Sequence, residues 1–145
     1  MQSIAIDFDA VIHKYSKGWQ DGSIYDEHID GVFEAIRDLM KTNTVFIFST
    51  RSPRQIKRWV TERIMCMEMG DNPHDPQEWT WAKYGYTCKI IPFWVKFWNK
   101  ENCLGITKRK LPAMVYVDDR ALTFRGNWNE TMDDILNFKT YQQRK

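Results

Sequence analysis

Apolar residues along the chain fall into two kinds of segment. Short β-prone runs predict strands at residues 2–7, 44–48, 87–91, 104–107 and 114–117, and the pattern leaves open whether the third or the fourth of these is more central. Apolar positions at helical spacing predict amphipathic helices at residues 31–41 and from 53 onward, and shorter helices at 93–98 and 131–138. Strands that alternate with helices predict one α/β domain with a mostly parallel sheet and right-handed crossovers.

Two segments interrupt this alternation. Residues 10–28 are rich in glycine, serine, aspartate and tyrosine, which predicts an irregular flap with turns at Gly18 and Gly22. Residues from about 66 to 100 form an insertion with a dense aromatic group: Trp79, Trp81, Tyr84, Tyr86, Phe93, Trp94, Phe97 and Trp98. Stacking on a nucleobase is one interpretation of this group. Core packing or a partner interface explains it better, and an interaction module with an exposed apolar patch is a further alternative.

Composition narrows the class of protein. The chain has 145 residues, of which 43% are hydrophobic and 28% charged, as in a single globular domain. A net charge of +2 does not by itself indicate a nucleic-acid partner. The chain has no apolar run long enough for a membrane span, and we expect no signal peptide because a strand begins almost at residue 1. The three cysteines, Cys66, Cys88 and Cys103, have no paired spacing, so we expect free thiols in a cytoplasmic protein and no zinc site.

Two pairs of aspartates follow two of the predicted strands. Asp7 and Asp9 end the first strand, and Asp118 and Asp119 end the last one. Like charges are costly inside a strand, so these pairs belong at the carboxyl ends, where ligands bind in open parallel sheets. Carboxylates that meet there can bind Mg²⁺, which prefers one or two carboxylates, water and phosphate oxygens.

Hydroxyl and basic side chains follow the other strands. Ser49 ends the strand at 44–48, and Thr50 competes with it as a phosphate ligand. The basic cluster Lys108-Arg109-Lys110 follows the strand at 104–107, and either Lys108 or Lys110 could be a phosphate-binding lysine. A hydroxyl and an ammonium group suit phosphate oxygens that a cation leaves free.

The order of these signals resembles the haloacid dehalogenase (HAD) superfamily of phosphatases, and the resemblance covers nearly the whole chain. Four motifs carry it: Asp7-x-Asp9, Ser49 followed by Thr50-Arg51, Lys110, and Asp118-Asp119. The resemblance implies a three-layer, Rossmann-like fold with helices on both faces of the sheet, a short flap and no full cap domain. It also implies a Mg²⁺-dependent phosphatase.

The resemblance assigns roles to the acidic residues. Asp7 looks like the nucleophile that forms an aspartyl-phosphate. Asp9 looks like the general acid and base, and its backbone carbonyl like a metal ligand. Asp118 looks like a direct Mg²⁺ ligand, with Asp119 acting through water. An open, minimally capped site suits a phosphorylated small molecule such as a nucleotide, or a nucleic-acid end, as in the phosphatase half of polynucleotide kinase.

The chain departs from the family at one position that bears on activity. The usual Gly-Thr after Asp-x-Asp is Ala10-Val11 here, so the threonine hydroxyl that commonly supports the second aspartate is missing. This departure motivates an alternative function, a catalytically weak protein that binds phosphate or a nucleotide. The pattern does not indicate an oligomeric state.

Four residues near these motifs have open roles. Arg51 and Arg120 are equally suited to structural ion pairs and to ligand contact. His13 and Trp19 lie in the flap, where packing is a better explanation for them than contact with a substrate.

Overall fold

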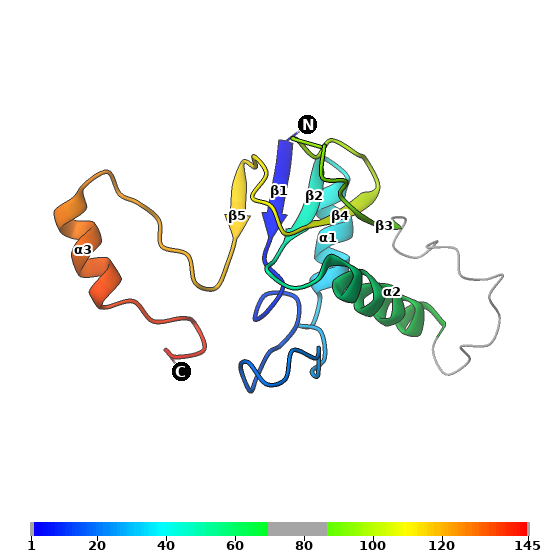
Figure 1. Cartoon of the computed structure of the whole chain (residues 1–145), viewed down its shortest axis with the longest axis horizontal. Coiled ribbons are helices and arrows are strands. Elements are labelled where there is room, and N and C mark those ends of the chain that lie inside the picture. The colour runs from blue at the N-terminus through cyan, green and yellow to red at the C-terminus, as the bar shows by residue number, and fades with distance from the viewer. Residues whose placement is uncertain (1, 70–86, 145) are drawn as a thin grey trace.

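The computed structural model describes residues 2–69 and 87–144 and contains one five-stranded sheet within them. The strands are β1 (Gln2–Ile6), β2 (Asn43–Phe48), β3 (Thr87–Ile90), β4 (Cys103–Thr107) and β5 (Val115–Val117). They lie in the order β3-β4-β2-β1-β5, and every neighbouring pair is parallel (Figure 1). All carboxyl ends therefore meet at one edge, with the flap beside them.

The helices begin where the sequence supplies starting residues. α1 (Val32–Met40) follows Gly31, whose φ of 82° suits glycine. α2 (Pro53–Met69) begins with a proline, whose fixed φ suits the first helical turn. α3 (Trp128–Leu136) has Asn127 as its N-cap, and the Asn127 side chain accepts a hydrogen bond from the Glu130 amide.

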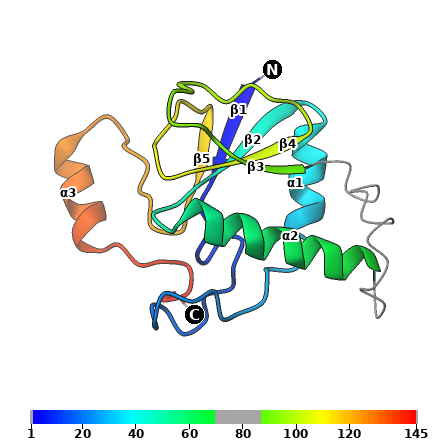
Figure 2. The ribbon, with the colours of Figure 1, turned by 45° about the vertical axis from the view of Figure 1, so that its right-hand side comes forward.

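One face of the sheet is covered by α1 and α2 (Figure 2). Ile4, Ile6, Val45 and Ile47 contribute the strand side of this core, whose helix side consists of Phe33, Ile36, Met40, Ile56, Val60 and Ile64. β1, β2 and β4 are buried along most of their length, as in parallel strands that are covered on both faces.

The opposite face is covered by the segment between β3 and β4. Trp98 is 1% exposed and packs there with Ala5 and Phe46. Gly105 permits this contact, because a Cβ atom at this position would lie 2.8 Å from Cε2 of Trp98. The Trp98 backbone carbonyl also accepts hydrogen bonds from Ser3 Oγ at 2.7 Å and from Thr44 Oγ1 at 2.9 Å.

Most of the expected elements are confirmed with small shifts. All five strands form, and β4, not β3, lies next to β2. The flap contains no regular helix or strand. The C-terminal helix begins at Trp128, three residues before the predicted start at 131, because Asn127 caps it there.

The helix predicted at 93–98 is wrong. These residues form turns, and Phe93 and Trp94 are exposed. The Arg109 guanidinium donates hydrogen bonds to the carbonyls of Pro92 and Val95, at 2.8 and 2.9 Å. These tertiary contacts replace the helical pairing that the apolar spacing suggested.

The aromatic insertion divides into several parts. Residues 66–69 continue α2, and residues 87–90 form β3. Trp79, Trp81, Tyr84 and Tyr86 lie outside the described residues. Trp98 is a core residue, whereas Phe93, Trp94 and Phe97 are exposed.

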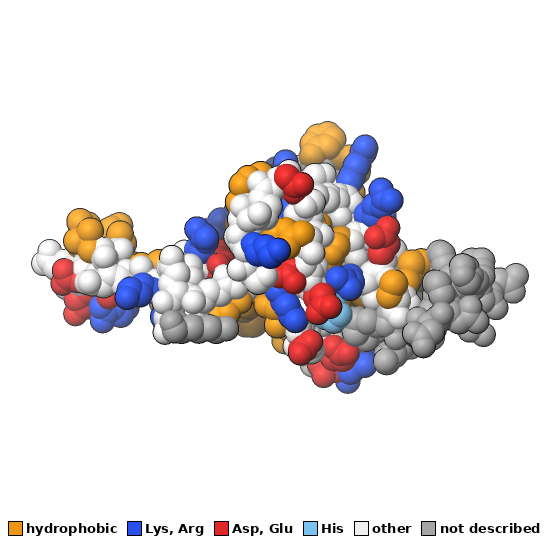
Figure 3. All heavy atoms as spheres, turned by 90° about the horizontal axis from the view of Figure 1, so that it is seen from below, with side chains coloured by type: hydrophobic (Ala, Val, Ile, Leu, Met, Phe, Trp, Pro, Cys, Tyr) orange, Lys and Arg blue, Asp and Glu red, His pale blue; other side chains and the backbone are white. Residues whose placement is uncertain are grey.

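We call residues 115–144, which comprise β5, α3 and the tail, the C-terminal arm. β5 is an edge strand whose three residues are all exposed. α3 stands apart from the sheet in Figure 1, and Figure 3 shows hydrophobic side chains gathered over it. Among the described residues, no helix has the length and apolar character needed to cross a membrane.

Candidate functional site

The end of β1 brings Asp7 next to the end of β5. The Asp7 amide donates a hydrogen bond to the Val117 carbonyl at 2.9 Å, which continues the β1–β5 pairing one residue beyond the strand. Asp118 and Asp119 follow Val117 directly, so sheet pairing alone places three carboxylates at one point of the edge.

These three carboxylates form a group that can hold a cation. One oxygen from each of Asp7, Asp118 and Asp119 lies within 4.8 Å of the other two. Burial, together with the nearby Asp118 and Asp119 carboxylates, raises the pKa of Asp7 to about 8, although the Phe8 amide opposes this shift. A hard divalent cation would favour the ionised form of all three groups, so the donor set fits Mg²⁺.

The two acids after β5 are held differently. Asp118 is exposed, and its Oδ1 accepts a hydrogen bond from the Arg120 amide at 2.9 Å. The Asp119 side chain is only 7% exposed, and its Oδ2 lies 3.7 Å from Arg120 Nε. Arg120 therefore contacts both acids and lies at the rim of the site.

Ser49 and Thr50 join this edge from β2. The Ser49 amide donates to the Thr107 carbonyl at 3.1 Å, which fixes the end of β2 against β4. The Ser49 hydroxyl oxygen accepts a hydrogen bond from the Arg51 amide at 3.2 Å, so its own proton can be directed to another acceptor. Ser49 is buried, whereas Thr50 is exposed.

The Asp9 carboxylate is engaged by two neighbouring side chains. Arg51 Nε lies 3.0 and 2.8 Å from its two oxygens, and His13 Nδ1 lies 2.9 Å from Oδ1. Burial alone would raise the pKa of Asp9, but the hydrogen bonds from His13 and Arg51 outweigh it and leave this pKa below its usual value. Asp9 is thus held as a carboxylate, and it is not a member of the three-carboxylate group.

His13 is fully buried, and its hydrogen bonds determine its tautomer. Its Nε2 accepts a hydrogen bond from the Asp26 amide at 3.0 Å. We therefore assign the proton to Nδ1, which donates it to Asp9. His13 and Arg51 are thus the hydrogen-bond partners of Asp9, a role that the sequence left open. The only sequence signal for it was their position, four residues after Asp9 and two residues after Ser49.

The residue after Asp9 has an unusual backbone conformation. Ala10 has a φ of 65°, in the left-handed region that favours glycine. This is the position at which the HAD pattern has glycine. The Ala10 carbonyl accepts a hydrogen bond from the Tyr141 hydroxyl at 2.6 Å, which links the tail of the C-terminal arm to the site.

The two candidate lysines lie apart from this group. Lys110 Nζ is 5.0 Å from the centroid of the Tyr116 ring, and Lys108 is exposed. A cleft of about 340 Å³ at the carboxylates is lined by Asp7, Asp9, Tyr15, Trp19, Ser49, Thr50, Asp119 and Arg120. Neither lysine belongs to this lining, so the structure brings together the acids and hydroxyls but places neither Lys108 nor Lys110 beside them.

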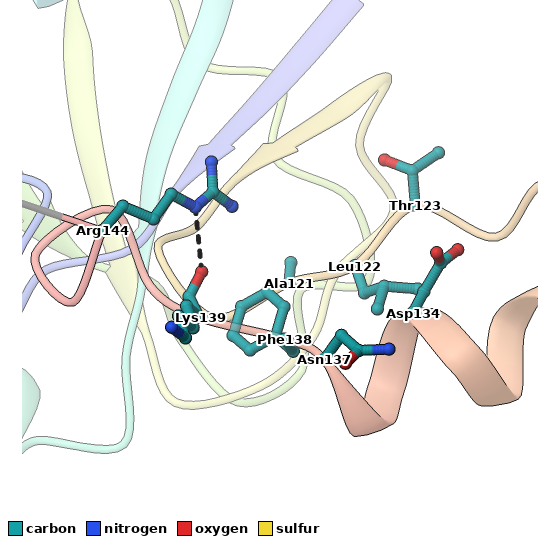
Figure 4. A pocket seen from close by; sticks show the side chains of 8 residues that line it. All are labelled: Ala121, Leu122, Thr123, Asp134, Asn137, Phe138, Lys139 and Arg144. Atoms are coloured by element: carbon teal, nitrogen blue, oxygen red, sulfur yellow. Dashed lines mark hydrogen bonds between the residues drawn. The ribbon is translucent and has the colours of Figure 1, made fainter.

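A larger hollow of about 680 Å³ lies elsewhere, between the loop after β5 and α3 (Figure 4). One carboxylate lines it, that of Asp134, and Arg125 Nη2 lies 2.9 Å from this carboxylate. Arg144 Nε donates a hydrogen bond across the hollow to the Lys139 carbonyl at 3.1 Å. Its carboxylate is already paired with Arg125, so the smaller cleft is the better candidate site.

Comparisons with protein-family models, with curated proteins and with solved structures found no match to this chain. The functional argument therefore depends on the residues and on their geometry.

Proposed function

We propose that this protein is a Mg²⁺-dependent phosphomonoester hydrolase that acts through an aspartyl-phosphate on Asp7. The observation that supports it best is the convergence of Asp7, Asp118 and Asp119 at the carboxyl edge of a parallel sheet, beside Ser49. Three neighbouring carboxylates, of which Asp7 and Asp119 line an open cleft with Ser49, suit a cation and a phosphoryl group better than they suit a structural ion pair.

The cation would be held by Asp7, Asp118 and Asp119. When bound, it would reduce the repulsion between the Asp7 carboxylate and a phosphate dianion. Without a cation, burial and the neighbouring acids raise the pKa of Asp7 to about 8, and a protonated carboxyl group is a poor nucleophile. A bound cation would favour the ionised, nucleophilic form of Asp7.

The residues of the chain would divide the reaction into two steps. An Asp7 oxygen attacks phosphorus, and the bond from phosphorus to the leaving oxygen breaks, so that the leaving group departs as an anion and takes a proton from solvent water. The Ser49 hydroxyl donates a hydrogen bond to the phosphoryl group. Water then attacks the aspartyl-phosphate and releases inorganic phosphate and free Asp7. Asp9 lines the same cleft as an ionised carboxylate, so it is the candidate base that accepts a proton from this water, although Arg51 and His13 weaken it as a base.

The same Asp9 contacts favour a second candidate function. Both Asp9 oxygens already accept hydrogen bonds, so Asp9 is poorly prepared to donate a proton to a leaving alkoxide. A protein with this arrangement would bind a phosphate or a nucleotide and hydrolyse it slowly. A leaving group that departs as a stable anion, such as 4-nitrophenolate, needs little protonation. Comparing it with an alkyl leaving group therefore separates the hydrolase from the slow phosphate or nucleotide binder.

The finer features of the fold belong to the same proposal. The parallel sheet and the short flap are compatible with a minimally capped HAD-like domain. A helical layer on the Trp98 face, which the three-layer HAD arrangement requires, stays a prediction, as does a cytoplasmic location. Phosphate binding by Lys110 would require its ammonium group to move from the Tyr116 ring toward the cleft.

The proposed function is tested by hydrolysis of 4-nitrophenyl phosphate and of an alkyl phosphate, with Mg²⁺ and with EDTA. We expect Mg²⁺-dependent turnover that falls more than about a thousand-fold in Asp7→Asn, because the nucleophile is lost. Asp133→Asn, an exposed aspartate on α3, is the matched control and should keep full activity. With radiolabelled substrate, acid-quenched protein should carry label that hydroxylamine removes.

Turnover that persists in Asp7→Asn would exclude this mechanism. Mg²⁺-dependent binding of phosphate without turnover of either substrate would instead support the second candidate.

A further inference from the structure

The cleft beside the carboxylates continues beneath the flap. A neighbouring hollow of about 390 Å³ shares Asp9, Tyr15, Trp19 and Thr50 with the cleft, and extends to Gly22, Arg51, Ser52 and Gln55. The two hollows therefore adjoin: Asp7 and Asp119 line the first, Ser52 and Gln55 line the second, and the rings of Tyr15 and Trp19 line both.

Trp19 is exposed although it lines both hollows. Its side chain is 68% exposed, whereas Phe8 and His13 nearby are fully buried. An indole ring left open to a pocket is available to a ligand, and burial of its face would be favourable. Packing within the flap therefore covers only part of the Trp19 ring.

The turn at Gly22 determines where the Trp19 ring lies. Gly22 has a φ of 90°, and a Cβ atom at this position would lie 3.3 Å from Cη2 of Trp19. The Gly22 carbonyl accepts hydrogen bonds from Arg51 Nη1 at 2.7 Å and from Gln55 Nε2 at 2.8 Å. The turn is thus tied to the start of α2, and the ring is positioned against it.

We propose that Trp19 and Tyr15 form the wall of a nucleobase subsite, so that the substrate of the Asp7 site is a nucleotide. This inference rests on the proposed function for the phosphate end of the substrate. Aromatic side chains stack on any base, because every base has a planar π-face. The Arg51 guanidinium lies 5.9 Å from the centroids of both the Tyr15 and the Trp19 rings, and adds a planar cation to the same wall.

The second hollow suits the polar edge of a base. Ser52 supplies a hydroxyl, and Gln55 supplies an amide. An amide has two N–H groups and one carbonyl oxygen, so Gln55 can donate to Gly22 and still pair with a base. An alkyl chain or a plain sugar phosphate would leave these groups without a matching partner.

The test compares adenosine 5′-monophosphate with ribose 5-phosphate as substrates in Mg²⁺. For the wild type we expect a higher kcat/KM with the nucleotide. In Trp19→Ala the ratio of the two kcat/KM values should fall about 5- to 100-fold through KM, and Trp19→Phe should restore most of it, because phenylalanine also stacks. Trp128→Ala is the matched control, since Trp128 is 67% exposed on α3, and it should leave the ratio unchanged.

An equal kcat/KM for the two substrates in the wild type, or an unchanged ratio in Trp19→Ala, would overturn the inference while leaving the hydrolase proposal intact. If the wild type hydrolyses 4-nitrophenyl phosphate but neither of these two substrates, the inference fails and the hydrolase proposal stands. If it hydrolyses none of the three, the proposed function fails, and calorimetry with adenosine 5′-monophosphate and ribose 5-phosphate tests the subsite alone. Preferential binding of the nucleotide that is lost in Trp19→Ala would then support it, and equal or absent binding would refute it. A 5′-phosphorylated oligonucleotide as a third substrate distinguishes a terminal nucleotide from a free one.

Discussion

The two sides of β1 differ in how their side chains are packed. Toward β2 and β4, most strand residues are buried and lie in continuous apolar cores. Toward β5, all three strand residues are exposed, and the hydrophobic residues Trp128, Met132, Ile135 and Leu136 of α3 are exposed as well. The candidate site lies on this boundary, because Asp7 follows β1 and Asp118 and Asp119 belong to the C-terminal arm.

This difference shows that the site has one rigid side and one weakly packed side. Asp7, Asp9 and Ser49 follow buried strands, so their backbone positions are fixed by the core. Asp118 and Asp119 depend on a three-residue strand and on contacts of the arm such as Tyr141 with Ala10. A cation that binds all three carboxylates would tie the arm to the core.

The largest effect is expected when a tryptophan of the core is compared with a tryptophan of the C-terminal arm. Trp98→Ala should lower the free energy of unfolding by about 3–5 kcal/mol, because it leaves a cavity between the β3–β4 segment and the sheet. Trp128→Ala should change it by less than about 0.5 kcal/mol, because Trp128 is largely exposed. Urea unfolding measures both, and similar losses would show that α3 is packed in solution as firmly as the core.

The second prediction concerns the three carboxylates that join the regions. The pKa of Asp7 is raised from 3.8 to about 8 in the metal-free fold, so the folded state retains a proton that the unfolded state loses above pH 4. The stability of the wild type in EDTA should therefore fall as pH rises from 4 to 8. Asp7→Asn removes the cost of ionising a carboxyl group that is partly buried beside two other acids. The variant should therefore be more stable than the wild type by about 1–2 kcal/mol at pH 8, after discounting for partial exposure.

Unfolding in EDTA at pH 5 and pH 8 measures this difference, which should be larger at pH 8. Added Mg²⁺ should stabilise the wild type more than Asp7→Asn, because the variant lacks one of the three ligands. A variant less stable than the wild type at pH 8 would contradict the proximity of the three acids.

The sequence predicted the strand ends that form the site better than the side-chain contacts around them. Continuous apolar runs specify β1, β2 and β4, and the acids and hydroxyls that follow them must meet, because carboxyl ends of parallel strands share an edge. The Arg51 and His13 contacts with Asp9 could not be predicted, because they depend on how the flap folds over α2. The position of the Lys110 side chain could not be predicted either. Its place in the sequence near the last motif suggested that it lines the cleft, but a long side chain can equally lie over Tyr116.

Local and tertiary signals also competed outside the site. The start of α3 was missed although Asn127 and Glu130 have the spacing of an N-terminal cap. The apolar spacing at 93–98 was misleading, because the Arg109 side chain donates hydrogen bonds to the backbone carbonyls of Pro92 and Val95. Both errors arise where a single side chain, not a periodic pattern, determines the backbone.

The third prediction weakens the contact between the arm and the site. Tyr141→Phe removes the hydroxyl that donates to the Ala10 carbonyl and should cost about 0.5–1.5 kcal/mol. Because Ala10 adjoins Asp9, we expect kcat with 4-nitrophenyl phosphate to fall as well. Tyr25→Phe is the control, since its hydroxyl donates to Gly18 within the flap. An equal loss of kcat in both variants would show that the arm has no special link to the site.

The smallest expected effect tests the backbone at Ala10 against the interior of β1. Ala10 has a φ of 65°, which is unfavourable for any residue with a Cβ atom, so Ala10→Gly should stabilise the fold by about 0.5–1 kcal/mol. The same substitution at Ala5, which is buried in the extended β1, should destabilise it by about 1 kcal/mol, because glycine gains no conformational advantage there. Thermal unfolding measures both, and a loss of stability in Ala10→Gly would show that the buried methyl group matters more than the backbone strain. A gain in stability would show that the wild type retains backbone strain at Ala10, beside Asp9, where the site requires this conformation.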